Sequence, residues 1–122
     1  MREKLFLYVV AGFYLLFAIL YFVFPAALTE PMGLTASNAG LIDIRAVYGG
    51  VQLGLAIFLW WSTQEDDRIY PGLLVTVLLT GGIALGRILG IILAGEIGNH
   101  WIGLVIEIVV TGIGVWLILR RK

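Results

Sequence analysis

The sequence predicts an all-α integral membrane protein, a four-helix bundle whose two termini are both cytoplasmic. Of its 122 residues, 61% are hydrophobic and 13% are charged, whereas a soluble domain of this size carries about a quarter charged residues. This composition excludes a soluble enzyme domain and a disordered chain. Because the three residues at the carboxyl end form the only basic stretch, nucleic-acid binding is also excluded.

Four apolar runs account for the predicted helices, because about 20 helical residues cross a hydrocarbon core. They cover residues 5–24, 41–61, 71–93 and 101–119, and we assign residues 1–122 to one transmembrane domain. The first run is longer than the 7–15 apolar residues of a signal peptide, so we expect a retained helix. None of the runs alternates in polarity as the strands of a membrane barrel do.

The segments between the runs support this division. Residues 62–70 and 94–100 are short, so the runs they join are expected to be antiparallel neighbours. Residues 25–40 form a longer segment that contains proline and glycine. Ser37 or Asn38, which precede the second run, are expected to cap its helix.

Lysine and arginine predict the orientation. Six basic residues fall at the two termini and in the segment 62–70, whereas segments 25–40 and 94–100 contain none. By the positive-inside rule, both termini then lie in the cytoplasm, and we expect the inner (plasma) membrane of a bacterium or archaeon. The basic residues on that side are Arg2, Lys4, Arg68, Arg120, Arg121 and Lys122.

Glycines recur at a spacing of four in the third run, at Gly82, Gly86 and Gly90. Small residues at this spacing allow two membrane helices to approach closely. Two interpretations stay open: tight packing inside one bundle, or a homodimer formed through this ridge.

Ionisable side chains inside the runs need a partner or a purpose, because each costs about 2.5–3.5 kcal/mol at the centre of a membrane helix. Arg87 lies six residues before the end of the third run, and Glu107 lies six residues after the start of the fourth. Six residues span about 9 Å of helix, so both side chains lie at one depth on antiparallel helices. We therefore predict an Arg87–Glu107 ion pair.

The polar residues also share helix faces. Arg45, Tyr48 and Gln52 have the i, i+3, i+7 spacing of one α-helical stripe in the second run. Two further stripes hold the predicted pair, namely Thr76, Thr80, Ala84 and Arg87 in the third run, and Gly103, Glu107, Thr111 and Gly114 in the fourth. We predict that the stripes converge on a ligand-binding cavity in the outer half of the bundle, lined by Arg45, Tyr48, Gln52, Arg87 and Glu107, with Asp43 at its rim.

Two interpretations of this cluster compete. Intramembrane ionisable residues commonly mark a binding or transport site, but the same groups also suffice for a structural clasp. His100 is expected to be a solvated loop residue. With no cysteine and one histidine, we expect no metal and no cofactor.

The run from Asp43 to Gly54, DIRAVYGGVQLG, and the Gly-Arg-x-x-Gly step at Gly86 carry a family resemblance. With the Glu107 helix, they resemble a family of small bacterial four-span membrane proteins catalogued as a domain of unknown function. The chain is also distantly similar to DoxX-like proteins. The resemblance implies that the family's recurrent polar residues fall on Arg45, Tyr48, Gln52, Arg87 and Glu107, with Gln52 where relatives often have an acid.

Three functional hypotheses follow. The preferred one is a membrane protein that binds or passes a small anionic or amphipathic (lipophilic) molecule, with membrane lipid as its surroundings. The alternative is a structural or accessory subunit without a ligand of its own. The third is an enzyme, for which Glu107 and Asp43 are the only plausible proton donors and which lacks a recognisable nucleophile or cofactor motif; we lean against it.

Overall fold

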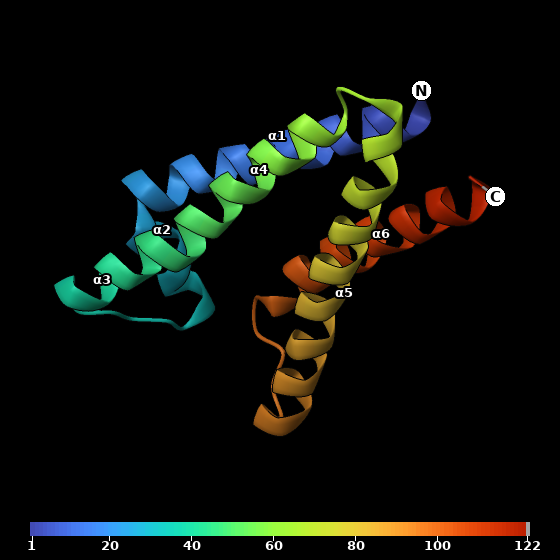
Figure 1. Cartoon of the computed structure of the whole chain (residues 1–122). Helices are drawn as coiled ribbons and strands as arrows, with labels where there is room; N and C mark the ends of the chain where they lie inside the picture. Colours follow the sequence, from blue (N-terminus) through green and yellow to red (C-terminus); the bar gives the residue numbers. More distant parts are fainter. Residues whose placement is uncertain (122) are drawn as a thin grey trace. The chain divides into compact units, whose positions relative to one another are not determined.

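The computed structural model describes residues 1–121, which form helices joined by turns and short irregular segments, with no strand over that range. Four helices are long and apolar enough to cross a membrane (Figure 1), so the predicted all-α fold with four spanning helices is confirmed. The cytoplasmic position of both termini stays a prediction. These candidate spans are Arg2–Val23, Asn38–Ser62, Asp66–Ala94 and His100–Arg120. Each begins before the apolar run that predicted it, because polar residues continue the first turn of the helix.

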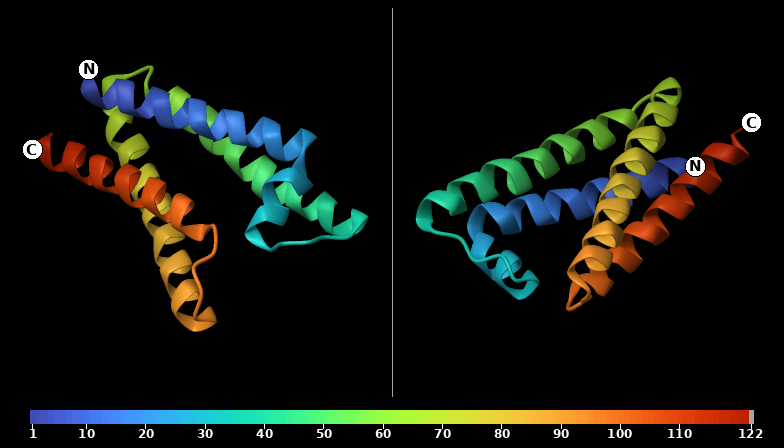
Figure 2. Two further views of the ribbon diagram at one scale, coloured as in Figure 1. Left: turned by 180° about the vertical axis from the view of Figure 1, so that it is seen from behind. Right: turned by 90° about the horizontal axis from the view of Figure 1, so that it is seen from below.

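The chain divides into two compact units, Met1–Arg68 and Ile69–Lys122. In the first unit, helix α1 (Arg2–Val23) packs along α4 (Gly50–Ser62), as Figure 2 shows in blue and green. Small side chains are prominent among the buried residues of the two helices, which favours close contact between membrane helices. These buried residues include Ala11, Ala18 and Ala56 beside Leu7 and Leu59.

Short helices join α1 to α4. After α2 (Pro25–Thr29) and the 3-10 turn η1 (Glu30–Met32), the chain enters α3 (Asn38–Ile44) and the π-helical segment η2 (Arg45–Gly49). The Ser37 hydroxyl accepts a hydrogen bond from the Gly40 N–H at 3.2 Å. Of the two predicted caps, Ser37 is therefore the one that begins this span.

Helix α1 lies close to η2 at Gly49. A Cβ added there would lie 2.6 Å from the ring of Phe22, so no larger residue fits without a shift of that ring. Gly49 is buried. The absence of a side chain thus allows the end of α1 to lie directly against the π-helical segment.

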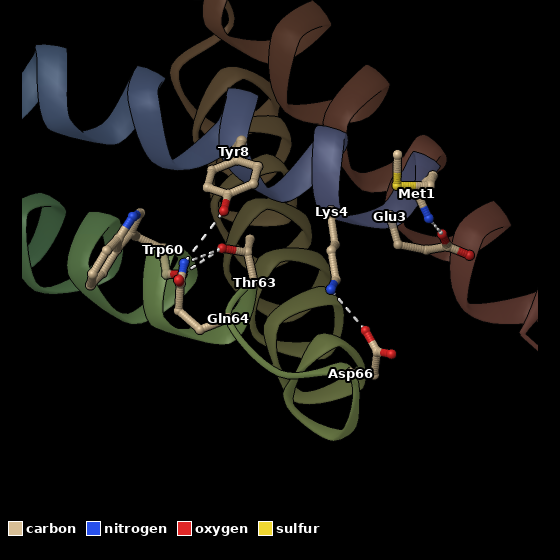
Figure 3. A network of polar contacts seen from close by, with 8 residues as sticks. All are labelled: Met1, Glu3, Lys4, Tyr8, Trp60, Thr63, Gln64 and Asp66. Carbon is tan, nitrogen blue, oxygen red and sulfur yellow. Dashed lines mark hydrogen bonds and ion pairs between the residues drawn. The ribbon is translucent and has the colours of Figure 1, made fainter.

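A polar network ties the turn after α4 to the start of α1 (Figure 3). Lys4 and Asp66, in the 3-10 turn η3 (Asp66–Arg68), form an ion pair at 2.8 Å. The Gln64 amide donates to the Trp60 carbonyl at 3.0 Å and to the Tyr8 hydroxyl at 3.4 Å. These contacts join the first turns of α1 to the segment that follows α4. They lie near Met1 in Figure 3.

The second unit is a hairpin of α5 (Ile69–Ala94) and α6 (His100–Arg120). Gly95 and Gly98, which have positive φ angles of 73° and 49°, turn the chain between the two helices. The hydroxyl groups of Thr80 and Thr111 lie 2.7 Å apart and join the helices near their middle. Thr111 also lies 3.4 Å from the position of a Cβ at Gly81.

The predicted glycine ridge does not form the α5–α6 contact. A Cβ added at Gly82, Gly86 or Gly90 would have no atom within 4 Å, whereas Gly81 and Gly103 face side chains of the partner helix. Within this unit, the ridge is therefore an open face of α5.

Candidate functional site

Arg87 and Glu107 form an ion pair between α5 and α6, which confirms the prediction made from their equal depth. The Arg87 Nε lies 3.1 and 3.0 Å from the two carboxylate oxygens, and Nη2 lies 2.6 Å from Oε1. The side chains are 24% and 13% exposed. A guanidinium that meets a carboxylate through two nitrogens is a strong and directional contact.

The predicted stripes around this pair agree with the structure. Thr76, Thr80 and Ala84 are buried on the α5 face that leads to Arg87. On α6, Gly103 provides the space that the guanidinium occupies, since a Cβ there would lie 3.2 Å from the Arg87 Cζ. The guanidinium therefore lies against the backbone of α6, one turn before Glu107.

The expectation of a solvated loop for His100 is wrong. This residue is the first of α6, is only partly exposed, and places Nδ1 2.9 Å from the Arg87 Nη1. Arginine only donates hydrogen bonds, so Nδ1 is the acceptor. The sequence does contain a signal for this position. If the fourth helix begins at His100 rather than at Trp101, then His100, Gly103 and Glu107 have the i, i+3, i+7 spacing of one helix face.

Arg45 lies in the first unit and contacts the end of α1. Its Nε donates a hydrogen bond to the Phe22 carbonyl at 3.0 Å. Carbonyls in the last turn of a helix lack intrahelical partners and attract cations, so Arg45 stabilises this helix end. The side chain is exposed, and among residues 1–121 no carboxylate forms an ion pair with it.

Tyr48 stacks on Tyr21, with ring centroids 5.4 Å apart and an interplanar angle of 29°. Arg45 and Tyr48 thus both meet the end of α1, at neighbouring residues. Gln52, in α4, is partly exposed, and Asp43, in α3, is exposed.

A π-helical segment interrupts the predicted stripe of Arg45, Tyr48 and Gln52. The spacing i, i+3, i+7 shares a face only if 3.6 residues complete each turn. Arg45–Gly49 is a π-helix, whose wider turn departs from this period, and the shared face of the three residues therefore stays a prediction. Single π turns inside α-helices are frequent at functional sites.

Four of the six predicted site residues therefore occur in two clusters. Arg87 and Glu107, together with His100, form one in the second unit, and Arg45 with Tyr48 forms the other in the first. A single cavity that all of them line stays a prediction. Over the described part of the chain, no three histidine or acidic residues form a group that could hold a metal ion.

The four long apolar helices identify a multi-pass helical membrane protein. Residues 3–118 match the family model described as Domain of unknown function (DUF4345), and the chain therefore belongs to this family. This confirms the resemblance to a domain of unknown function. No curated protein and no solved structure matches the chain.

Proposed function

We propose that this protein binds an amphipathic molecule with an anionic head group in the membrane, and that Arg45 holds that head group. The observation that carries the proposal is an exposed arginine in a membrane-spanning segment that has no carboxylate partner among the described residues. A charge in such a segment is costly unless it is paired. An anionic ligand supplies the missing partner.

The geometry of Arg45 favours an oxyanion. Because Phe22 accepts the Nε proton, the two terminal nitrogens keep their four N–H groups for a ligand. These groups form a planar fork that matches a phosphate or carboxylate with two oxygens. Arg45 is seven residues into the span that begins at Asn38, about 10 Å along the helix, which suits a head group near the membrane surface.

The neighbouring residues suit the rest of an amphipathic ligand. Phe24 and Val47 are 60% and 58% exposed and offer apolar surface to a hydrocarbon tail. Tyr48, 44% exposed, offers an aromatic face and a hydroxyl group beside Arg45. In this proposal, Asp43 and Gln52 border the site, and the protein binds the ligand or passes it across the membrane.

The membrane and the orientation belong to the same proposal. The six basic residues at the termini and in the 62–70 segment favour cytoplasmic termini in a bacterial inner membrane. Arg45 then faces the non-cytoplasmic leaflet.

A structural or accessory subunit is the second candidate, favoured by the Arg87–Glu107 pair. Its guanidinium is engaged by a carboxylate and by His100, so this cluster suffices as a clasp between α5 and α6. A homodimer through Gly82, Gly86 and Gly90 is compatible with either candidate, because this ridge is open within its unit.

The test is a thermal-shift screen of the purified full chain with phosphatidylglycerol, palmitate, a neutral quinone and inorganic phosphate. We expect stabilisation by the anionic amphiphiles that Arg45→Gln abolishes and Arg45→Lys reduces, since lysine lacks the planar fork. Arg2→Gln, at an exposed position in the first turn of α1, is the matched control and keeps the response. If Arg45→Gln responds as the unsubstituted protein does, the proposal is refuted.

A further inference from the structure

The cluster at the start of α6 contains a hydrogen bond whose existence depends on the protonation of His100. Arg87 donates from Nη1 to the Nδ1 of His100 at 2.9 Å, while its Nε and Nη2 hold Glu107. Arg87 on α5 therefore holds two residues of α6, seven positions apart. The contact with His100 fixes the first turn of α6 against α5.

Only a neutral imidazole can accept this bond. Arginine stays protonated and has no acceptor, so the Nδ1 lone pair must be free and the imidazole proton must lie on Nε2. A protonated imidazole has a proton on both nitrogens. At 2.9 Å, an imidazolium would oppose one donor with another and one positive charge with another.

We propose that the Arg87–His100 contact is a pH-sensitive clasp, which is closed while His100 is neutral and opens when His100 is protonated. Opening releases the start of α6 from α5, while the Arg87–Glu107 pair remains. Histidine is the side chain whose ordinary charge change falls between pH 5 and pH 8, so acidification is the signal to which such a clasp responds. This inference does not rest on the proposed ligand.

Three charges and one helix end surround His100 in the hairpin. Arg87, from α5, and the positive amino end of α6 repel an imidazolium. Glu107, on α6, attracts one but already accepts three hydrogen-bond contacts from Arg87. Glu96, in the turn between the helices, is exposed to solvent. Protonation of His100 therefore turns its contact with the Arg87 guanidinium from a hydrogen bond into a repulsion.

Nuclear magnetic resonance of the full chain in lipid bilayers, with ¹⁵N-labelled histidine, reports on this residue alone, because the sequence has one histidine. At pH 7.5 we expect the tautomer with its proton on Nε2, and at pH 5 the doubly protonated form. Arg87→Gln removes the obligate donor and is expected to give both neutral tautomers. An Nδ1-protonated tautomer at pH 7.5 in the unsubstituted protein overturns the proposal.

Opening is measured by the distance between two spin labels attached to introduced cysteines. Because the native sequence has no cysteine, the labels attach only at the chosen positions. Labels at Leu89→Cys and Ile102→Cys, both exposed in the native chain, are expected to move apart between pH 7.5 and pH 5. Labels at Leu78→Cys and Val115→Cys, nearer the Thr80–Thr111 contact, are the control pair and keep their distance.

His100→Asn is the variant that separates titration from packing, because its side-chain oxygen accepts a hydrogen bond but does not titrate. We expect the label distance at Leu89→Cys and Ile102→Cys to become independent of pH in this background. The proposal is refuted if this label distance still changes with pH in the His100→Asn background. It is also refuted if the distance does not change with pH when His100 is present.

Discussion

The Arg87–Glu107 pair is predicted to be energetically coupled by about 3 kcal/mol. Arg87→Met leaves the Glu107 carboxylate, which is 13% exposed, without its cation, and Glu107→Leu leaves the guanidinium without its anion. Removal of one partner from a fully buried pair costs about 3–5 kcal/mol. Because both side chains here retain some exposure, we expect each substitution to lower the free energy of unfolding by about 2 kcal/mol.

The double variant Arg87→Met/Glu107→Leu is predicted to be more stable than either single variant. It buries apolar groups of similar volume in place of two charges, a replacement that is often neutral or stabilising. We expect it to lose about 1 kcal/mol, owing to the altered contacts with His100 and Gly103. The resulting coupling lies at the upper end of the range for directly contacting residues.

The assay is reversible unfolding by sodium dodecyl sulfate in mixed lipid–detergent micelles, monitored by tryptophan fluorescence. The four variants of the cycle are measured under the same conditions, and circular dichroism confirms their helix content. If the effects of the two single substitutions simply add in the double variant, the side chains do not interact and our account of the clasp fails.

Two further predictions concern the first unit. Gly49→Ala forces the Phe22 ring to move and is expected to lower the free energy of unfolding by about 1–3 kcal/mol. The control Gly50→Ala, whose added methyl group meets open space, is expected to be neutral or stabilising. Equal effects of the two substitutions in the same unfolding assay would contradict the packing of α1 on η2. Ser37→Ala removes the acceptor of the Gly40 N–H and is expected to lower the free energy of unfolding by about 1 kcal/mol. Ser37→Asp is expected to restore the cap. An unchanged unfolding midpoint for Ser37→Ala would show that the cap does not contribute to stability.

Local chemistry accounts for what could be predicted without coordinates. The length and apolarity of four segments predict four spanning helices, because hydrocarbon accepts no unpaired backbone. Arg87 and Glu107 were paired from depth alone, since two charges at one level of antiparallel neighbours have few other partners. Ser37 was among the expected caps because its hydroxyl mimics the missing backbone acceptor.

The contacts of Arg45 and His100 were decided by the tertiary structure. The π-helical turn at Arg45–Gly49, where Gly49 lies against Phe22, interrupts the α-helical period of the expected stripe. Helix periodicity carries no information about such a turn, because it assumes a constant number of residues per turn.

Sequence alone thus determined the membrane-spanning class, the helix order and the common level of Arg87 and Glu107, all of which depend on residues close together in the chain. Only the tertiary structure decided that Arg45 binds a carbonyl of α1, that His100 joins Arg87, and that Gly81 and Gly103, rather than the Gly82 ridge, lie between α5 and α6. Those choices depend on the rotation of one helix against another. That rotation is set by the fit of side chains from distant segments, which no local pattern encodes.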